Sequence, residues 1–178
     1  MKSILVPIDG SPHAGRALAI ACDLARAHGA QLKLFHILLR DRDPGELLRL
    51  PAAGRLPEQH TAELKRHHEA PAPELTADQI MAAPESTGKR VGEDHLQAVA
   101  KAVLEEAEEQ VAAQGIDCQV IALGDGAPAK QIVEVAELAA VDAIVMGCRG
   151  LSSIEAFTLG SASQDVCRQA PCPCIMVH

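Results

Sequence analysis

Residues 141–163 read VDAIVMGCRGLSSIEAFTLGSAS, an apolar run followed by a loop that contains glycine and hydroxyl residues. The run at 141–146 predicts a buried strand, and we expect a helix to begin near the end of the quoted stretch. Glycine lets the backbone approach a ligand without a Cβ in the way, and the N–H groups at the start of a helix favour an anion. The stretch therefore predicts a phosphate-binding loop. Its glycines and hydroxyls are Gly147, Gly150, Gly160, Ser161 and Ser163.

Outside this stretch, segments typical of strands alternate with segments typical of helices. Apolar runs predict strands at residues 3–8, 31–39, 118–123, 143–146 and 174–177. Helical periodicity and start signals predict helices after Pro12, over about 95–114, after Pro128 and over about 161–169. Apolar strands that alternate with helices are typical of a parallel sheet covered on both faces. We therefore expect an α/β fold with a doubly wound five-stranded parallel sheet in the strand order 3-2-1-4-5.

The first predicted helix has sequence signals at both ends. Ser11 is a favoured N-cap, Pro12 suits the first helical position and Gly29 is placed to end the helix. In a doubly wound sheet, ligands lie beyond the carboxyl ends of the strands where the winding reverses. Asp9 follows the first strand and Gly147 the fourth, so we expect these strands to be neighbours. Asp9 is interpreted as a nucleotide contact, and the alternative is an Asx turn that leads into the helix.

Length and composition restrict the function classes. The chain has 178 residues, which suits one domain over residues 1–178 with an insertion. A net charge of −8, two Phe and no Trp or Tyr argue against nucleic-acid binding. Because no apolar run approaches the length of a membrane span and no signal peptide is evident, we expect a cytoplasmic protein that does not bind a membrane. In that compartment the six cysteines are expected to be free thiols.

Residues 40–92 do not fit the alternating pattern, and we interpret them as an insertion. Six prolines interrupt this segment: Pro44, Pro51, Pro57, Pro71, Pro73 and Pro84. Residues 58–69 and 76–83 could each form a short helix between these breaks. The segment is too long for an ordinary connection, which suggests a flap or a surface that binds a partner. The sequence does not show which parts of it are ordered.

Metal or redox interpretations exist for two groups of residues. His60, His67 and His68 could bind a metal, but solvated histidines are favoured on so polar a segment. Cys172 and Cys174 form a C-x-C pair, which offers two ligands where a structural zinc site uses four. A buried turn into the last strand is the favoured interpretation of that pair, and no metal site is expected.

Three segments of the chain resemble the ATP-binding universal stress proteins of the UspA type. They are residues 4–11 (ILVPIDGS), residues 144–151 (IVMGCRGL) and residues 159–173, which begin LGS and end APCP. That family's ATP-binding signature is Gly, two residues, Gly, nine residues, Gly and then Ser or Thr, and it is present in full from Gly147 to Ser161. The resemblance covers about residues 1–39 and 93–178 and implies a Rossmann-like fold.

The resemblance also implies an ATP site that takes the nucleotide with Mg²⁺, and it assigns residues to its parts. The residues against the adenine and ribose would be Pro7, Ile8 and Asp9, with the backbone near Ile37 at the adenine edge. The residues along the ribose and the phosphates would be Met146, Gly147, Arg149, Gly150, Gly160, Ser161, Ala162 and Ser163. Arg149 could instead simply be solvated.

Two function classes remain open at this point. The first is a nucleotide-dependent regulator or sensor in the stress response that acts on a protein partner of unknown identity. The second is an enzyme with slow ATP hydrolysis or phosphoryl or nucleotidyl transfer. Phosphoryl transfer generally needs a lysine on the phosphates and carboxylates on Mg²⁺, but the chain has no Gly-Lys-Ser/Thr motif and only Glu155 and Asp165 as possible metal contacts. Binding is therefore favoured and no catalytic residue is assigned.

The resemblance further implies a homodimer through the last strand, 174–177, which fits a short apolar sheet edge.

Overall fold

The structure of the protein is a computed structural model that describes residues 1–40, 42–70, 91–151 and 160–178. The chain forms two compact units. The first contains Met1–Leu38 and Val103–His178, and the second contains Leu39–Ala102.

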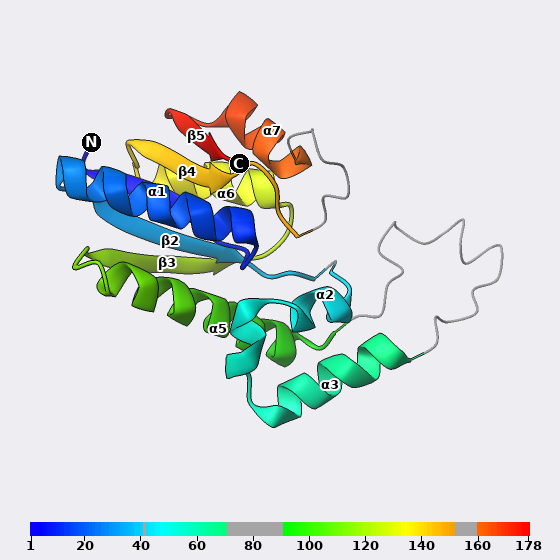
Figure 1. Ribbon diagram of the computed structural model, residues 1–178. Coiled ribbons are helices and arrows are strands. Elements are labelled where there is room, and N and C mark those ends of the chain that lie inside the picture. Colours follow the sequence, from blue (N-terminus) through cyan, green and yellow to red (C-terminus); the bar gives the residue numbers. More distant parts are fainter. Residues whose placement is uncertain (41, 71–90, 152–159) are drawn as a thin grey trace, which may run out of the picture. The chain divides into compact units, whose positions relative to one another are not determined.

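A five-stranded parallel sheet with the order β3-β2-β1-β4-β5 forms the centre of the first unit (Figure 1). Its strands are β1 (Ser3–Pro7), β2 (Gln31–Ile37), β3 (Cys118–Gly124), β4 (Ala143–Gly147) and β5 (Cys174–Val177). β1 lies between β2 and β4, so the chain winds outward in opposite directions from the centre of the sheet. The predicted α/β fold, its parallel strands and its strand order are confirmed.

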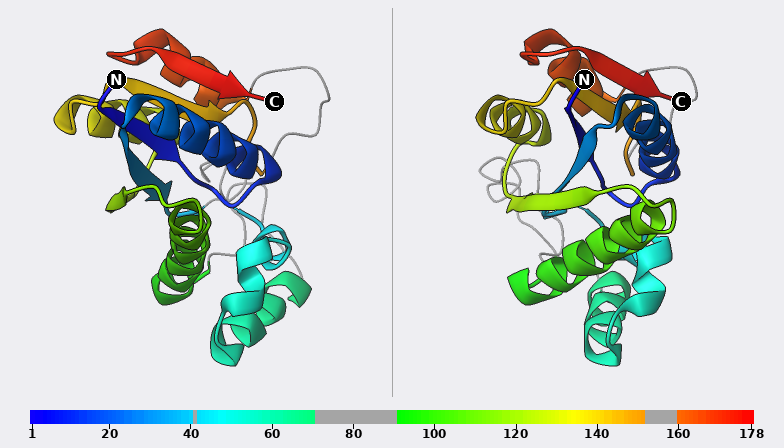
Figure 2. Two further views of the ribbon diagram at one scale, coloured as in Figure 1. Left: turned by 60° about the vertical axis from the view of Figure 1, so that its left-hand side comes forward. Right: turned by 90° about the vertical axis from the view of Figure 1, so that its left-hand side faces the viewer.

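Helices cover both faces of this sheet. The helices of the alternating pattern are α1 (Pro12–His28), α5 (Glu93–Ala112), α6 (Pro128–Leu138) and α7 (Ser161–Gln169). α1 lies on one face, and α6 and α7 lie together on the other (Figure 2). Phe35 of β2 is buried among side chains of α6 and α7, including Ile132 and Val166. The described core therefore lies on the two sides of the sheet and consists mainly of aliphatic side chains.

The ends of α1 follow from local chemistry. The Ser11 hydroxyl accepts a hydrogen bond from the N–H of Ala14 at 3.2 Å, and Pro12 occupies the first helical position. Gly29 ends the helix at φ +63°, a left-handed conformation that glycine adopts without a steric penalty, and its N–H donates to the Ala25 carbonyl. Both predicted caps are confirmed.

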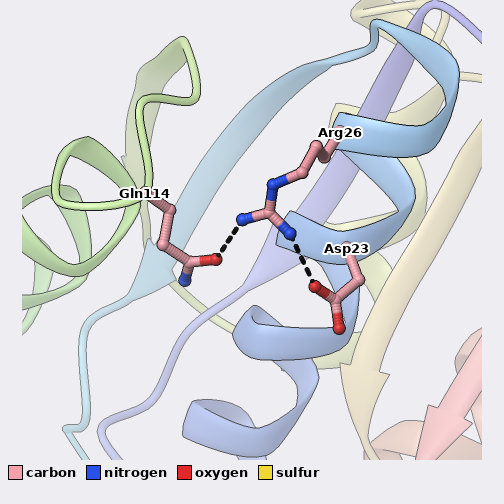
Figure 3. Close-up of polar contacts among 3 residues, drawn as sticks. All are labelled: Asp23, Arg26 and Gln114. Carbon is pink, nitrogen blue, oxygen red and sulfur yellow. Dashed lines mark hydrogen bonds and ion pairs between the residues drawn. The ribbon is translucent and has the colours of Figure 1, made fainter.

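A polar bridge connects α1 with the turn that follows α5. The Arg26 guanidinium donates to the Asp23 carboxylate at 2.9 Å and to the Gln114 side-chain carbonyl at 2.8 Å (Figure 3). The Arg26 and Asp23 side chains are exposed, so solvent screens this ion pair and limits its contribution to stability.

The second unit contains α2 (Pro44–Leu48), the 3₁₀ helix η1 (Pro51–Arg55), α3 (Glu58–Glu69) and the first half of α5. α2 packs against α3, and Leu47, Leu50 and Leu64 are buried. The helix predicted at 58–69 is confirmed, whereas the one predicted at 76–83 lies outside the described residues. A ring nitrogen of His60 lies 2.8 Å from one of His95, so one of these rings donates to the other.

Long apolar helices are absent from the described part of the chain. None of its helices is both long enough and apolar enough to cross a membrane.

Candidate functional site

The candidate site lies where β1 and β4 end. These strands are hydrogen-bonded neighbours, as predicted, and they are the pair at which the winding of the sheet reverses. β1 leads into Ile8 and Asp9, and β4 ends at Gly147, the first glycine of the loop. The crevice at such a strand pair is the usual ligand position in open α/β sheets.

Asp9 has two oxygen atoms in different surroundings. One oxygen, Oδ1, accepts a hydrogen bond from the N–H of Ser11 at 2.9 Å, which is the bond of an Asx turn into α1. The intervening Gly10 has φ +79°, so the turn requires a left-handed residue. The other oxygen, Oδ2, lies so near Gly150 that a Cβ built there would be 2.6 Å from it. The turn therefore holds the carboxylate against the glycine loop, and the two interpretations of Asp9 are compatible.

The three signature glycines differ in what surrounds them. A Cβ at Gly147 would lie 2.8 Å from the His13 Cβ and 2.9 Å from the His13 backbone carbonyl carbon. Packing of the end of β4 against the start of α1 thus explains Gly147. A Cβ at Gly150 would meet the Asp9 carboxylate, so glycine there permits the approach of these two residues.

The described residues give no such reason for Gly160. Its backbone has φ −63°, which any residue adopts, and the nearest atom to a built Cβ is the Cys148 carbonyl oxygen at 3.4 Å. An alanine would therefore fit in ordinary van der Waals contact. Neither its backbone conformation nor its described neighbours therefore require glycine at this position, and glycine leaves room for the close approach of another group.

Hydrogen bonds join the start of α7 to the loop after β4. The N–H of Gly160 donates to the Cys148 carbonyl at 2.8 Å. The Ser163 hydroxyl, which is buried, lies 2.8 Å from the same carbonyl and 2.7 Å from the Gly160 carbonyl, and it can donate to either. Ser163 thus fixes the geometry of the loop with its side chain, so its hydroxyl has a positioning role.

The first turn of α7 presents backbone donors. Gly160 is the N-cap, no side chain of the described residues caps the helix, and its first turn contains no acid. The amides of Ser161, Ala162 and Ser163 belong to the group of N–H donors that have no acceptor within the helix. With the positive end of the helix dipole, this turn can bind an anion.

Basic side chains lie near His13, at the start of α1. The pKa of His13 is below its ordinary value, first because of desolvation and then because of Arg16 and Arg149, while Asp9 opposes the shift. The Arg16 side chain donates to the His178 carbonyl at 2.7 Å. Basic groups thus lie near the Asp9 carboxylate at this end of the sheet, although the whole chain is acidic.

The remaining predicted residues occupy the ends of β1, β2 and β4. Pro7 and Ile37 are half-buried, and the N–H of the buried Ile8 donates to the Phe35 carbonyl at 2.8 Å. Met146 is buried in the core cluster. Of the possible metal contacts, Glu155 lies outside the described residues and Asp165 pairs with Arg168.

His36 is a candidate that the sequence reasoning missed. It is the penultimate residue of β2, it is buried, and its Nδ1 lies 2.7 Å from the Ile8 carbonyl. Because a carbonyl only accepts, Nδ1 carries the proton and Nε2 is left as an acceptor, for which no partner is present among the described residues. Burial lowers the pKa of His36, while the bond to Ile8 and the charge of Asp9 oppose that shift. The sequence signal that could have identified His36 is a histidine within a predicted strand that is mostly apolar.

Comparison with known proteins identifies the family. The profile of the Universal stress protein family matches residues 1–178, the whole length of the chain. The chain belongs to this family. A universal stress protein of Thermus aquaticus is 31% identical over 99% of this chain and 98% of its own length. The universal stress protein YxiE of Bacillus subtilis is 29% identical over 99% of both chains.

Solved structures of universal stress proteins share the fold. UspA from Lactobacillus plantarum superimposes with a TM-score of 0.64 at 22% identity, over 99% of this chain and 97% of that one. A protein from Archaeoglobus fulgidus, solved in complex with dAMP, has a TM-score of 0.60 at 20% identity, over 100% and 98% of the two chains. One from Arabidopsis thaliana, solved with AMP bound, has a TM-score of 0.57 at 14% identity, over 99% and 91%. Another universal stress protein was solved in complex with cAMP.

Proposed function

We propose that this universal stress protein binds ATP together with Mg²⁺ at the carboxyl ends of β1 and β4. The observation that carries the proposal is Gly160, for which neither backbone conformation nor packing against the described residues requires glycine, at the start of a helix whose first amides have no acceptor within the helix. Adenine nucleotides bound to other proteins of this fold support the same ligand class.

In the proposed complex, each part of the nucleotide meets a different part of the site. The nucleoside lies beside Pro7, Ile8 and Asp9, with the backbone of Ile37 at the adenine edge. Met146 and Gly147 at the end of β4 line the ribose and the α-phosphate side. The residues assigned to the phosphates beyond them are Arg149, Gly150, Gly160, Ser161, Ala162 and Ser163. The amides at the start of α7 donate to the phosphate oxygens, which offsets their charge.

We assign the protein a regulatory role in the stress response, in the cytoplasm. A ligand that binds one conformation or assembly more tightly than another shifts the equilibrium between them by mass action. A protein partner that recognises the ATP-bound state would then respond to the ATP concentration. The six cysteines are free, which suits a reducing compartment. The second candidate, slow ATP hydrolysis or group transfer, is distinguished by measuring turnover of Mg-ATP by the purified protein.

Calorimetric titration of ATP and Mg²⁺ into wild type and Gly160→Ala tests the binding site. The added methyl group has room among the described residues but enters the proposed phosphate cradle, so we expect the Kd to rise about tenfold or more, which corresponds to about 1.4 kcal/mol. Gly15→Ala is the matched control, because a Cβ at Gly15 has no neighbour within 4 Å among the described residues and Gly15 belongs to α1, not to the loop after β4. We expect its affinity to equal that of wild type.

Two results would contradict the proposal. One is the absence of any heat and any thermal shift when ATP is added to the wild type at millimolar concentration. The other is equal ATP affinity of Gly160→Ala and wild type, with both proteins shown to be folded by circular dichroism.

A further inference from the structure

The buried histidine of β2 is hydrogen-bonded to the first carbonyl after β1. β1 ends at Pro7, and the chain leaves the sheet through Ile8 toward Asp9. The Nδ1 atom of His36 lies 2.7 Å from the Ile8 carbonyl oxygen, and the carbonyl of Phe35 accepts from the Ile8 N–H at 2.8 Å. Two successive residues of β2 therefore hold both backbone groups of Ile8.

The bond from His36 also restricts the residue that follows Ile8. The Ile8 carbonyl and the Asp9 N–H belong to one planar peptide unit, so a bond that holds the carbonyl also holds the orientation of the Asp9 backbone. Beyond that unit, Asp9 Oδ1 accepts a hydrogen bond from the Ser11 N–H at 2.9 Å. Asp9 is thus held from both sides, with its Oδ2 placed 2.6 Å from where a Cβ at Gly150 would lie.

Packing against the described residues does not account for a histidine at position 36. His36 is 1% exposed, and its Nε2 has no hydrogen-bond partner among the described residues. A buried polar atom without a partner lowers stability, and an aliphatic side chain would avoid that cost. What His36 contributes in return is the N–H donor at Nδ1, which an aliphatic side chain lacks.

We propose that His36 is a positioning residue of the ATP site, where its bond to the Ile8 carbonyl sets the orientation of Asp9 beside the glycine loop. This inference rests on the ATP site proposed above and extends it to a buried residue outside the nucleotide contacts. His36 acts through Ile8 and Asp9, so its loss weakens ATP binding without removing a nucleotide contact. The donor at Nδ1 is the feature that binding requires, and the rest of the ring, including Nε2, is not needed.

Asparagine and leucine at position 36 separate the donor from the ring. The amide nitrogen of asparagine occupies the same position along the side chain as Nδ1 of histidine, so His36→Asn keeps a donor for the Ile8 carbonyl. His36→Leu has a side chain of similar shape and no donor. In calorimetric titrations with Mg-ATP, we expect the Kd of His36→Leu to be about fivefold higher than that of wild type, the effect of one lost hydrogen bond. His36→Asn should bind with nearly the affinity of wild type.

Leu34→Val controls for a general loss of packing in β2. Leu34 is buried, and it lies two residues before His36 on the same face of the strand. This variant should unfold at a lower urea concentration than wild type but bind ATP with the same affinity. Circular dichroism at the temperature of the titrations verifies that each variant is folded.

A measurement on the wild type does not depend on the folding of any variant. In ¹⁵N-labelled protein, long-range ¹H–¹⁵N spectra show which ring nitrogen of a neutral histidine carries the proton. We expect the proton of His36 on Nδ1, both without ligand and with Mg-ATP, because the Ile8 carbonyl only accepts. A proton on Nε2 alone would overturn the inference, since His36 could then donate no bond to Ile8.

The titrations distinguish this inference from the proposed function. If wild type binds ATP and folded His36→Leu binds it with equal affinity, the positioning role is wrong and the ATP site stands. If His36→Asn loses as much affinity as His36→Leu, the ring rather than the donor is required, and the inference is wrong. An equal loss in Leu34→Val would assign the effect to packing, which also overturns it. If wild type itself does not bind ATP, the proposed function fails and this inference fails with it.

Discussion

The buried ring of His36 makes the stability of this protein sensitive to acid. The folded-state pKa of His36 is below the ordinary value of 6.5, chiefly because burial penalises the charged ring. The unfolded chain therefore binds the proton more readily than the folded chain. Stability from this group is fully present above pH 6.5 and is lost as the pH falls through 6.5 toward the folded-state pKa.

We therefore expect the free energy of unfolding of the wild type to decrease on acidification from about pH 7.5 to about pH 5. In His36→Phe, which has a ring of similar size and no titrating group, the decrease should be smaller. The measurement is urea unfolding at several pH values, and the slope with pH is compared rather than the absolute stability, because the variant also loses the bond to Ile8. His13→Gln controls for His13, whose pKa is also lowered. Equal slopes for wild type and His36→Phe would contradict the expectation.

Two polar contacts of α1 should contribute differently to the free energy of unfolding: the buried N-cap at Ser11 and the exposed bridge at Arg26. The Ser11 hydroxyl is buried and accepts from the first turn of α1 at 3.2 Å, so water cannot replace it readily. We expect Ser11→Ala to lower the free energy of unfolding by about 1 kcal/mol in urea titrations. Arg26→Ala removes an exposed bridge and should cost less, about 0 to 1 kcal/mol. If the free energy of unfolding falls more in the Arg26 variant than in the Ser11 variant, the expectation that the buried contact stabilises the fold more than the exposed one is wrong.

Local signals predicted the elements of the sheet unit well. The caps of α1, the end of α7 and the bounds of β5 follow from residues within each segment, and the special residues after β1 and β4 indicated that these strands are neighbours. The predicted strands at 3–8 and 31–39 extend slightly beyond β1 and β2, because strand ends depend on pairing partners.

Two features of the structure were not predicted. α2 has five residues, too few for a helical period, although a local signal precedes it: the Asp43 side chain caps the helix by accepting from the N–H of Gly45 at 2.7 Å. The candidate site, too, was predicted only in part. Spacing indicated that Gly147 and Gly160 belong to one loop, but only the structure separates the glycine that packing explains from the one that packing does not.

At the scale of the whole molecule, β5 forms one edge of the sheet, and no strand of the described residues pairs with its outer side. The carbonyls of Pro173 and Val177 accept from Ile144 and Cys148 of the β4 segment. Because residues of a strand alternate in the direction of their backbone groups, the N–H and C=O groups of Cys174 and Met176 face the free edge. A second copy of the chain could pair with this edge across a two-fold axis, which is the homodimer that we propose.

Met176→Pro tests the proposed dimer because it removes one edge N–H and leaves the bonds to β4 in place. Proline is tolerated on an edge strand where its nitrogen faces away from the sheet, so the monomer should fold. We expect light scattering coupled to gel filtration to give a dimer for wild type and a monomer for Met176→Pro. Met176→Ala keeps the N–H but loses the same packing against the core cluster, and it should remain a dimer. A folded Met176→Pro dimer would place the contact elsewhere, since pairing at β5 needs the removed donor, whereas a monomeric Met176→Ala would assign the contact to the side chain.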